Sequence, residues 1–147
     1  MDRFIFKYLF DGKLHDVVAI DFNNGCVFIL IDSRKPIKTT LKLENLKQST
    51  GIRAKDGTLI FEGDILTDPD LEKIIEKIPN SPKPPKFIAK YHDRLHKFMI
   101  HITGMDDYMD LSEATKSDGI TTPYNIVGNI YTNNVIQFRP KGSQSSS

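Results

Sequence analysis

Two carboxylates, Glu62 and Asp64, flank Gly63 near the middle of the chain. Residues two apart on a strand face the same side, so these side chains could form a pair for general acid–base chemistry. Acidic groups beside a glycine kink more often accept hydrogen bonds from turn amides or pair with a lysine, and we favour that structural role for both. No catalytic residue is therefore predicted, and an enzyme is the third of three functional hypotheses.

A second group of residues could bind a metal, because imidazole and carboxylate groups are ligands for zinc and its neighbours. The group comprises His92, Asp93, His96 and His101. Two ligands four residues apart converge on one metal when they lie on a helix, whereas these residues fall in the loop and strands of a predicted hairpin. We interpret them as polar residues of an exposed loop. The sequence therefore predicts no metal site and no cofactor.

Length and composition exclude several classes of protein. The chain has 147 residues, of which 39% are hydrophobic, and its formal net charge of +1 gives no overall field for nucleic acid or an anionic membrane. Its one cysteine, Cys26, excludes a disulfide framework, and its apolar neighbours favour a buried, inert thiol. No apolar run approaches the ~20 residues that span a bilayer, and the start of the chain lacks the pattern of a secretory signal. We expect a cytoplasmic protein without a membrane partner.

The first 46 residues are predicted to form an N-terminal antiparallel β-meander. Short β-prone runs alternate with turn sequences such as Asp11-Gly12 and Asn24-Gly25, which suit two-residue hairpin turns. The third run is apolar on both faces and should be the most deeply buried strand. The expected strands cover residues 4–10, 14–22, 26–31 and 37–43.

Residues 47–138 are predicted to form a small, partly open β-barrel with one helix inserted. The expected strands lie near 59–66, 87–91, 97–103 and 125–131, and the last should pair near the strand that holds Gly63. Asp68 before Pro69 is typical of a helix start, and Leu71, Ile74, Ile75 and Ile78 then recur at helical spacing. This predicts a short amphipathic helix over 69–78 that covers the core. Residues 139–147 have nothing to bury and are predicted to be a disordered tail.

Two motifs organise this second region. Thr50 to Ile65 contains Gly51, Gly57 and Gly63, and further along the chain Val127 to Tyr131 contains Gly128, Asn129 and Tyr131. In this order the two segments resemble the YopX family, and the matching residues of the first are Gly51, Gly57, Ile60, Glu62, Gly63, Asp64 and Ile65. Ala54, Asp56 and Phe61 depart from the family pattern without preventing a turn or a strand. The resemblance implies a small phage or prophage protein of unknown activity, and implies the fold more than any chemistry.

Charge is segregated along the chain, basic at residues 34–47 and 83–97 and acidic at 61–76 and 106–118. Separate acidic and basic faces allow copies of one chain to associate. The first functional hypothesis is therefore a non-enzymatic, oligomeric adaptor. It would bind itself and an unidentified phage or host protein in the cytoplasm of a bacterial host.

The alternative hypothesis is a nucleic-acid-binding module that uses the hairpin 87–102. Its basic and aromatic side chains could contact single-stranded nucleic acid through phosphates and by stacking. The acidic segments argue against this alternative, which stays second. The contact residues it predicts are Lys90, Tyr91, Arg94 and Lys97.

Overall fold

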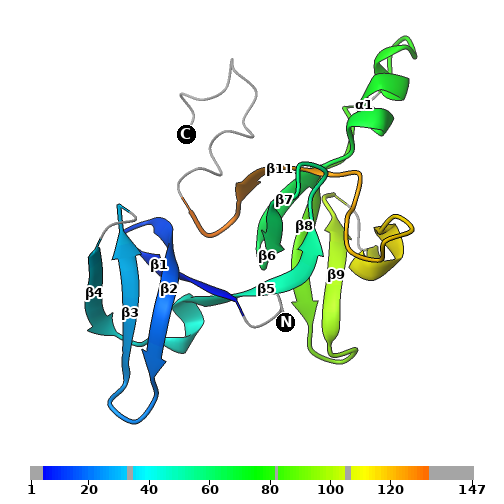
Figure 1. The fold of residues 1–147 in the computed structure, drawn as a ribbon. Helices are drawn as coiled ribbons and strands as arrows, with labels where there is room; N and C mark the ends of the chain where they lie inside the picture. Colours follow the sequence, from blue (N-terminus) through cyan, green and yellow to red (C-terminus); the bar gives the residue numbers. More distant parts are fainter. Residues whose placement is uncertain (1–4, 33–34, 82, 105–106, 133–147) are drawn as a thin grey trace.

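The computed structural model describes residues 5–32, 35–81, 83–104 and 107–132, and it is mainly β with one α-helix. Its strands form two antiparallel sheets, in the orders β4-β3-β2-β1-β5-β6 and β10-β9-β8-β7-β11 (Figure 1). This confirms the predicted mainly β fold with a single α-helix. Among the described residues the sheets are open and no closed barrel is found, so the partly open barrel stays a prediction. The predicted tail, 139–147, lies outside the described residues.

The N-terminal meander has four strands that pair in chain order, as predicted. Its centre is Tyr8, Val27 and Ile29, which are almost completely buried. The Tyr8 hydroxyl donates to the Thr40 carbonyl at 2.8 Å, so the first strand is tied to the end of the fourth. Cys26 is free and half-buried, whereas we expected a buried thiol. The strands are β1 (Phe6–Phe10), β2 (Lys13–Asp21), β3 (Cys26–Ile31) and β4 (Lys35–Thr40).

Strand β5 (Leu46–Arg53) lies between β1 and β6 in the first sheet and was not predicted from the sequence. Its first half pairs with β1, where Lys47 lies opposite Lys7, and its second half pairs with β6 (Leu59–Phe61). The register of the β5–β6 pairing shifts between Ser49 and Arg53. A 3₁₀ turn, η2 (Leu43–Asn45), precedes it. β5 thus crosses from the meander into the second half of the chain.

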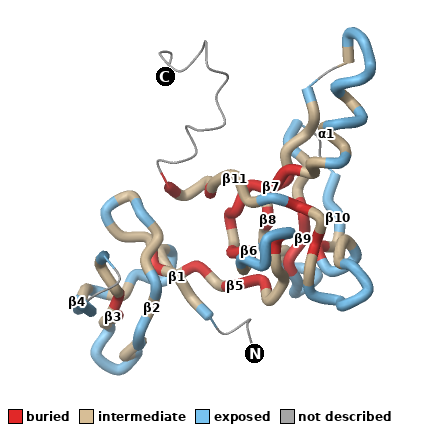
Figure 2. Tube along the Cα trace, turned by 45° about the horizontal axis from the view of Figure 1, so that its top comes forward, coloured by how far each residue is buried: buried red, intermediate tan, exposed pale blue. Residues whose placement is uncertain are grey.

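The second sheet has its own hydrophobic cluster, separate from that of the meander. Leu66 and Ile100 of this sheet and Ile60 of β6 are completely buried in this cluster, and the centres of the Phe87 and Tyr124 rings are 5.5 Å apart. The backbone coloured by burial shows buried segments gathered at β6, β7, β8 and β9 (Figure 2). The predicted pairing of the last strand with the strand after Gly63 is confirmed, because β11 runs antiparallel to β7. The elements are β7 (Asp64–Thr67), β8 (Phe87–His92), β9 (Lys97–Ile102), β10 (Tyr108–Asp110), η3 (Leu111–Ala114) and β11 (Asn125–Asn129).

Helix α1 (Pro69–Glu76) begins where the sequence predicts, but it does not cover the core. The Asp68 side chain accepts from the amides of Asp70 and Leu71 at 3.0 and 3.2 Å, which confirms the predicted N-cap. None of the residues of α1 is buried, and only Leu71 packs partly against the cluster. The prediction of a core-covering helix was wrong because α1 and the proline-rich connector after it project from the end of the sheet (Figure 1). No helix in the described part of the chain is long and apolar enough to cross a membrane.

Candidate functional site

The turn between β6 and β7 separates the two carboxylates that the sequence suggested as a pair. β6 ends at Phe61 and β7 begins at Asp64, and Gly63 in the turn has a φ of +87°. The predicted interruption at Gly63 is therefore present. Because the chain turns there, Glu62 and Asp64 do not share one strand, and the interpretation that both face one side of a strand was wrong. Asp64 is buried, whereas Glu62 is half-exposed.

The Asp64 carboxylate is buried and accepts two hydrogen bonds. One oxygen accepts from the Phe61 amide at 2.7 Å, and the other accepts from the side-chain amide of Asn129 at 2.9 Å. Burial raises the pKa of Asp64 to about 6, although these two hydrogen bonds and the charge of Lys7 act to lower it. The carboxylate stabilises the local structure, as the sequence predicted for an acid beside a glycine turn.

Asn129 connects the two motifs through both ends of its side-chain amide. Its Nδ2 group donates to the Asp64 carboxylate and also to the Glu62 carbonyl at 3.2 Å, while its Oδ1 accepts from the Tyr131 amide at 2.8 Å. The backbone adds two bonds, since the Gly63 amide donates to the Ala89 carbonyl at 2.7 Å and the Gly63 carbonyl accepts from the Ile130 amide at 2.9 Å. The turn is thus fixed by β8 on one side and by the segment after β11 on the other.

Tyr131 covers the glycine turn and contacts a lysine of the first sheet. A Cβ atom on Gly63 would overlap the Tyr131 ring. Lys47 Nζ lies 3.6 Å from the centre of that ring, and the Tyr131 hydroxyl donates to the Glu62 carboxylate at 3.3 Å. Burial, with the nearby Glu62 carboxylate, raises the pKa of Tyr131. This role of Lys47 was not predicted, because no local pattern marks a lysine that packs on a ring far along the chain.

Five of the eight predicted motif residues meet in this cluster, which we call the motif junction. The other three lie elsewhere. Gly51 is in β5 near its register shift, Gly57 is in the turn after β5, and Gly128 is opposite Ile65 in β11. The residues of the motif junction are Glu62, Gly63, Asp64, Asn129 and Tyr131.

The predicted hairpin 87–102 is present, but its four predicted contact residues do not share a face. β8 and β9 pair with Tyr91 opposite Phe98, and Lys90 and Tyr91 are neighbours on a strand, so they face opposite sides. Lys97 forms an ion pair with Asp110 of β10 at 2.7 Å, which holds the pKa of Asp110 below its ordinary value. The Lys97 ammonium group is therefore paired with a carboxylate of the same sheet. Arg94 lies exposed in the loop.

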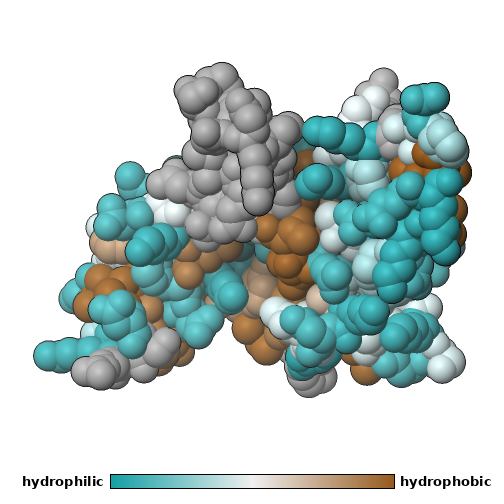
Figure 3. Space-filling view, turned by 90° about the horizontal axis from the view of Figure 1, so that it is seen from above, coloured by the Kyte–Doolittle hydropathy of each residue, from teal (hydrophilic) through white to brown (hydrophobic). Residues whose placement is uncertain are grey.

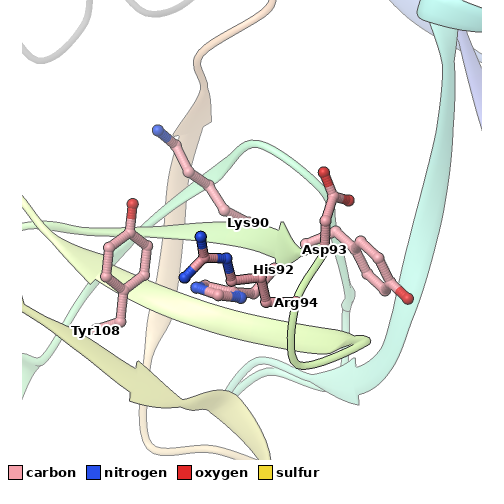
Figure 4. A pocket seen from close by; sticks show the side chains of 6 residues that line it. Lys90, His92, Asp93, Arg94 and Tyr108 are labelled. Carbon is pink, nitrogen blue, oxygen red and sulfur yellow. The ribbon is translucent and has the colours of Figure 1, made fainter.

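A surface hollow of about 480 Å3 brings Lys90 and Arg94 together with aromatic side chains (Figure 4). Tyr108, which comes from β10, has its ring 5.7 Å from that of His92 and 4.8 Å from that of His101. Tyr108 was not among the predicted site residues, because the acidic and irregular sequence around it predicts no strand at residues 108–110. We call this the basic hollow, and it is lined by Lys90, Tyr91, His92, Asp93, Arg94 and Tyr108.

The histidines of the hairpin do not assemble a metal site. Within the described residues, no three His, Cys, Asp or Glu side chains are placed to hold a metal ion. His92 Nδ1 lies 3.3 Å from the Leu95 amide, which orients the His92 ring within the loop. His101 stacks on Tyr108, away from the loop.

In this small, mainly β protein, hydrogen bonds join a glycine turn to a distant Gly-Asn-Ile-Tyr segment. A family model described as "YopX protein" matches residues 13–136. The chain belongs to the YopX protein family, as the resemblance of its motifs predicted.

The comparison with solved structures found protein EF1440 from Enterococcus faecalis, which is 22% identical to this chain. The match covers 88% of this chain and 94% of that one, with a TM-score of 0.48. No curated protein matches the chain.

Proposed function

We propose that this protein is a non-enzymatic, homo-oligomeric interaction module, an adaptor encoded by a phage or prophage that works in the cytoplasm of its bacterial host. The observation that carries the proposal is the exposed apolar side of α1. Ile74 lies in α1 and Ile78 two residues after its end, and their side chains are 58% and 51% exposed. In the view from above, hydrophobic surface lies among hydrophilic residues on the side of the molecule that carries α1 (Figure 3). An apolar helix face that nothing in the described part of the chain covers is typical of an interaction surface.

The charges of α1 favour a second copy as the occupant of this face. Asp70 lies in the first turn, next to Ile74 on the helix surface, and Lys77 follows the last turn on the same side. When two copies of α1 pack antiparallel about a two-fold axis, Asp70 of each copy lies near Lys77 of the other. The contact is then complementary in charge as well as apolar at its centre.

The motif junction supports a structural role for the residues that the family pattern contains. Asp64 is buried, and its hydrogen bonds go to neighbouring elements. The side-chain nitrogen and oxygen of Asn129 both form hydrogen bonds within the motif junction. These groups join β6, β7 and β11. The proposed function therefore rests on exposed surfaces and not on the motif.

Light scattering behind size-exclusion chromatography tests the self-association. We expect a discrete multiple of 16.7 kDa for the wild type, and a smaller mass for Ile74→Asp and Ile78→Asp. Val18→Asp is the matched control, because Val18 is 54% exposed on β2, and it should leave the mass unchanged. A monomeric wild type at micromolar concentrations would overturn the proposal.

Charge reversal tests the antiparallel arrangement. Asp70→Lys and Lys77→Asp should each weaken association, because each places like charges together. The double variant Asp70→Lys/Lys77→Asp should restore it. If the double variant does not recover the wild-type association, the antiparallel arrangement is excluded, but self-association as such is not.

The basic hollow favours a second candidate function, binding of single-stranded nucleic acid. Lys90 and Arg94 could contact phosphates, and Tyr108, which is 44% exposed, could stack on a base. Fluorescence anisotropy with a labelled oligonucleotide at low and high salt tests it. Lys90→Glu/Arg94→Glu should abolish binding, whereas Lys97→Ala should change it little because Lys97 is paired with Asp110. Unchanged binding by the double variant would exclude this function.

A further inference from the structure

We infer that a second hollow beside the hairpin binds the guanidinium group of an arginine side chain from a partner protein. This acidic hollow holds about 550 Å3 and adjoins the basic hollow, with which it shares Tyr91 and Asp93. It goes beyond the proposed self-association, because the hairpin loop lies at the end of the sheet away from α1 (Figure 1). The lining residues are Gln48, Glu62, Tyr91, Asp93 and Phe98.

Three separate parts of the chain form the acidic hollow and hold it in place. Gln48 comes from β5, Glu62 from the glycine turn, and the others from the β8–β9 hairpin. The Glu62 amide donates to the Gln48 carbonyl at 3.1 Å, and the Gly63 amide donates to the Ala89 carbonyl at 2.7 Å. The turn is therefore anchored to β5 and to β8. A site fixed in this way loses little freedom when a ligand enters.

The chemistry of the lining suits a planar cation. Glu62 and Asp93 contribute two carboxylates, and the Tyr131 hydroxyl donates to one oxygen of Glu62 and so orients that group. A guanidinium group donates to carboxylates through a planar fork of N–H groups, which an ammonium group lacks. The acidic hollow therefore offers acceptors of the type that arginine recognises.

Aromatic rings complete the site. Tyr91 is 39% exposed, and its ring packs edge-on against Phe98 with the ring centres 5.3 Å apart, which fixes its orientation. An arginine side chain stacks on such a ring by cation–π attraction. Asp93 lies at the end of the basic hollow away from Tyr108 (Figure 4). The cations Lys90 and Arg94 line the basic hollow and not the acidic one. The adjoining hollows thus favour ligands of opposite charge.

A pair of peptides tests the inference with a single change of charge. The probe is acetyl-Gly-Arg-Gly-amide, and its control replaces arginine with citrulline, which keeps the shape and removes the charge. In proton–nitrogen NMR spectra of the full chain, we expect the arginine peptide to shift the amides of Glu62, Tyr91 and Asp93 saturably. The citrulline peptide should cause no saturable shift. Equal binding of both peptides, or of neither, would overturn the inference.

Substitutions then assign the binding to the acidic hollow. Asp93 lies in an exposed loop. Asp93→Asn should weaken binding of the arginine peptide about tenfold, as expected for the loss of a charged hydrogen-bond acceptor. Glu62→Gln should do the same while keeping an acceptor for Tyr131. Lys90→Ala is the control from the basic hollow and should not weaken binding. Undiminished affinity of Asp93→Asn for the arginine peptide would contradict the proposed site. The masses of the α1 variants test self-association independently of this result.

Discussion

The side-chain amide of Asn129 donates to the carboxylate of Asp64 at 2.9 Å, between residues 65 positions apart in the chain. This one bond joins the two segments by which the chain resembles its family. It also lies beside the Gly63 turn, which Tyr131 covers and which β8 holds by a backbone bond. Changes at this place should therefore affect stability more than any surface change.

The stability of the protein should fall as the pH rises through the range in which Asp64 ionises. The folded pKa of Asp64 is about 6 against an ordinary value of 3.8, so between these values the folded protein keeps a proton that the unfolded chain has released. The difference corresponds to about 3 kcal/mol of unfolding free energy, present below pH 4 and lost by pH 7. Urea unfolding at several pH values measures it.

The variant Asp64→Asn isolates this effect, because it cannot ionise. Its stability relative to the wild type should rise by about 3 kcal/mol between pH 4 and pH 7. Carboxyl groups with lowered pKa values act in the opposite direction and below pH 4, among them Asp118 at about 2. A constant difference between variant and wild type across this range would contradict the assignment.

Asn129→Ala should destabilise the protein by roughly 2–3 kcal/mol, because it removes a donor from a buried carboxylate and a partner from the Tyr131 amide. Asn125→Ala is the matched control, since Asn125 is exposed in the same strand. It should change the unfolding free energy by about 0.5 kcal/mol or less. Chemical denaturation of both variants makes the comparison, and similar losses in both would count against the role of Asn129.

Gly63→Ala should cost roughly 2–4 kcal/mol, because an added Cβ atom overlaps the Tyr131 ring and the backbone has a positive φ. Gly57→Ala has a similar φ of +92° with no atom within 4 Å of the added Cβ, so it should cost only about 1–2 kcal/mol. Thermal or urea unfolding separates the two. If the overlap is the cause, Gly63→Ala combined with Tyr131→Ala should be less destabilising than the sum of the two single changes.

Asp68→Ala should loosen α1 and leave the sheets folded. The side chain caps two amides of the first turn, and its loss should lower helix stability by about 1 kcal/mol. Because no residue of α1 is buried, the global unfolding free energy should stay within about 0.5 kcal/mol of the wild type. Amide hydrogen exchange measures the local loss. Glu72→Ala keeps the cap and should leave exchange in α1 almost unchanged.

The sequence by itself determined the features that depend on neighbouring residues. The hairpin turn at Asp11-Gly12, the start of α1 after Asp68 and the hairpin 87–102 are all present where they were predicted. Each is fixed by interactions within a few residues, such as a side chain that caps a turn or apolar residues that alternate along a strand. The motif resemblance added the family, and the pairing of the last strand near the strand that holds Gly63 was predicted as well.

Only the tertiary structure decided which surfaces meet. β5 is largely polar and has no clear alternation, and it is a strand because β1 and β6 both pair with it. Two other contacts also depend on parts of the chain that are distant in sequence. Lys47 lies on the Tyr131 ring, and Glu62 lines a hollow together with Asp93. Helical spacing likewise predicted an apolar face on α1, but whether the sheet covers it depends on the direction in which the chain leaves β7. Burial is set by contacts across the whole fold, which local patterns do not contain.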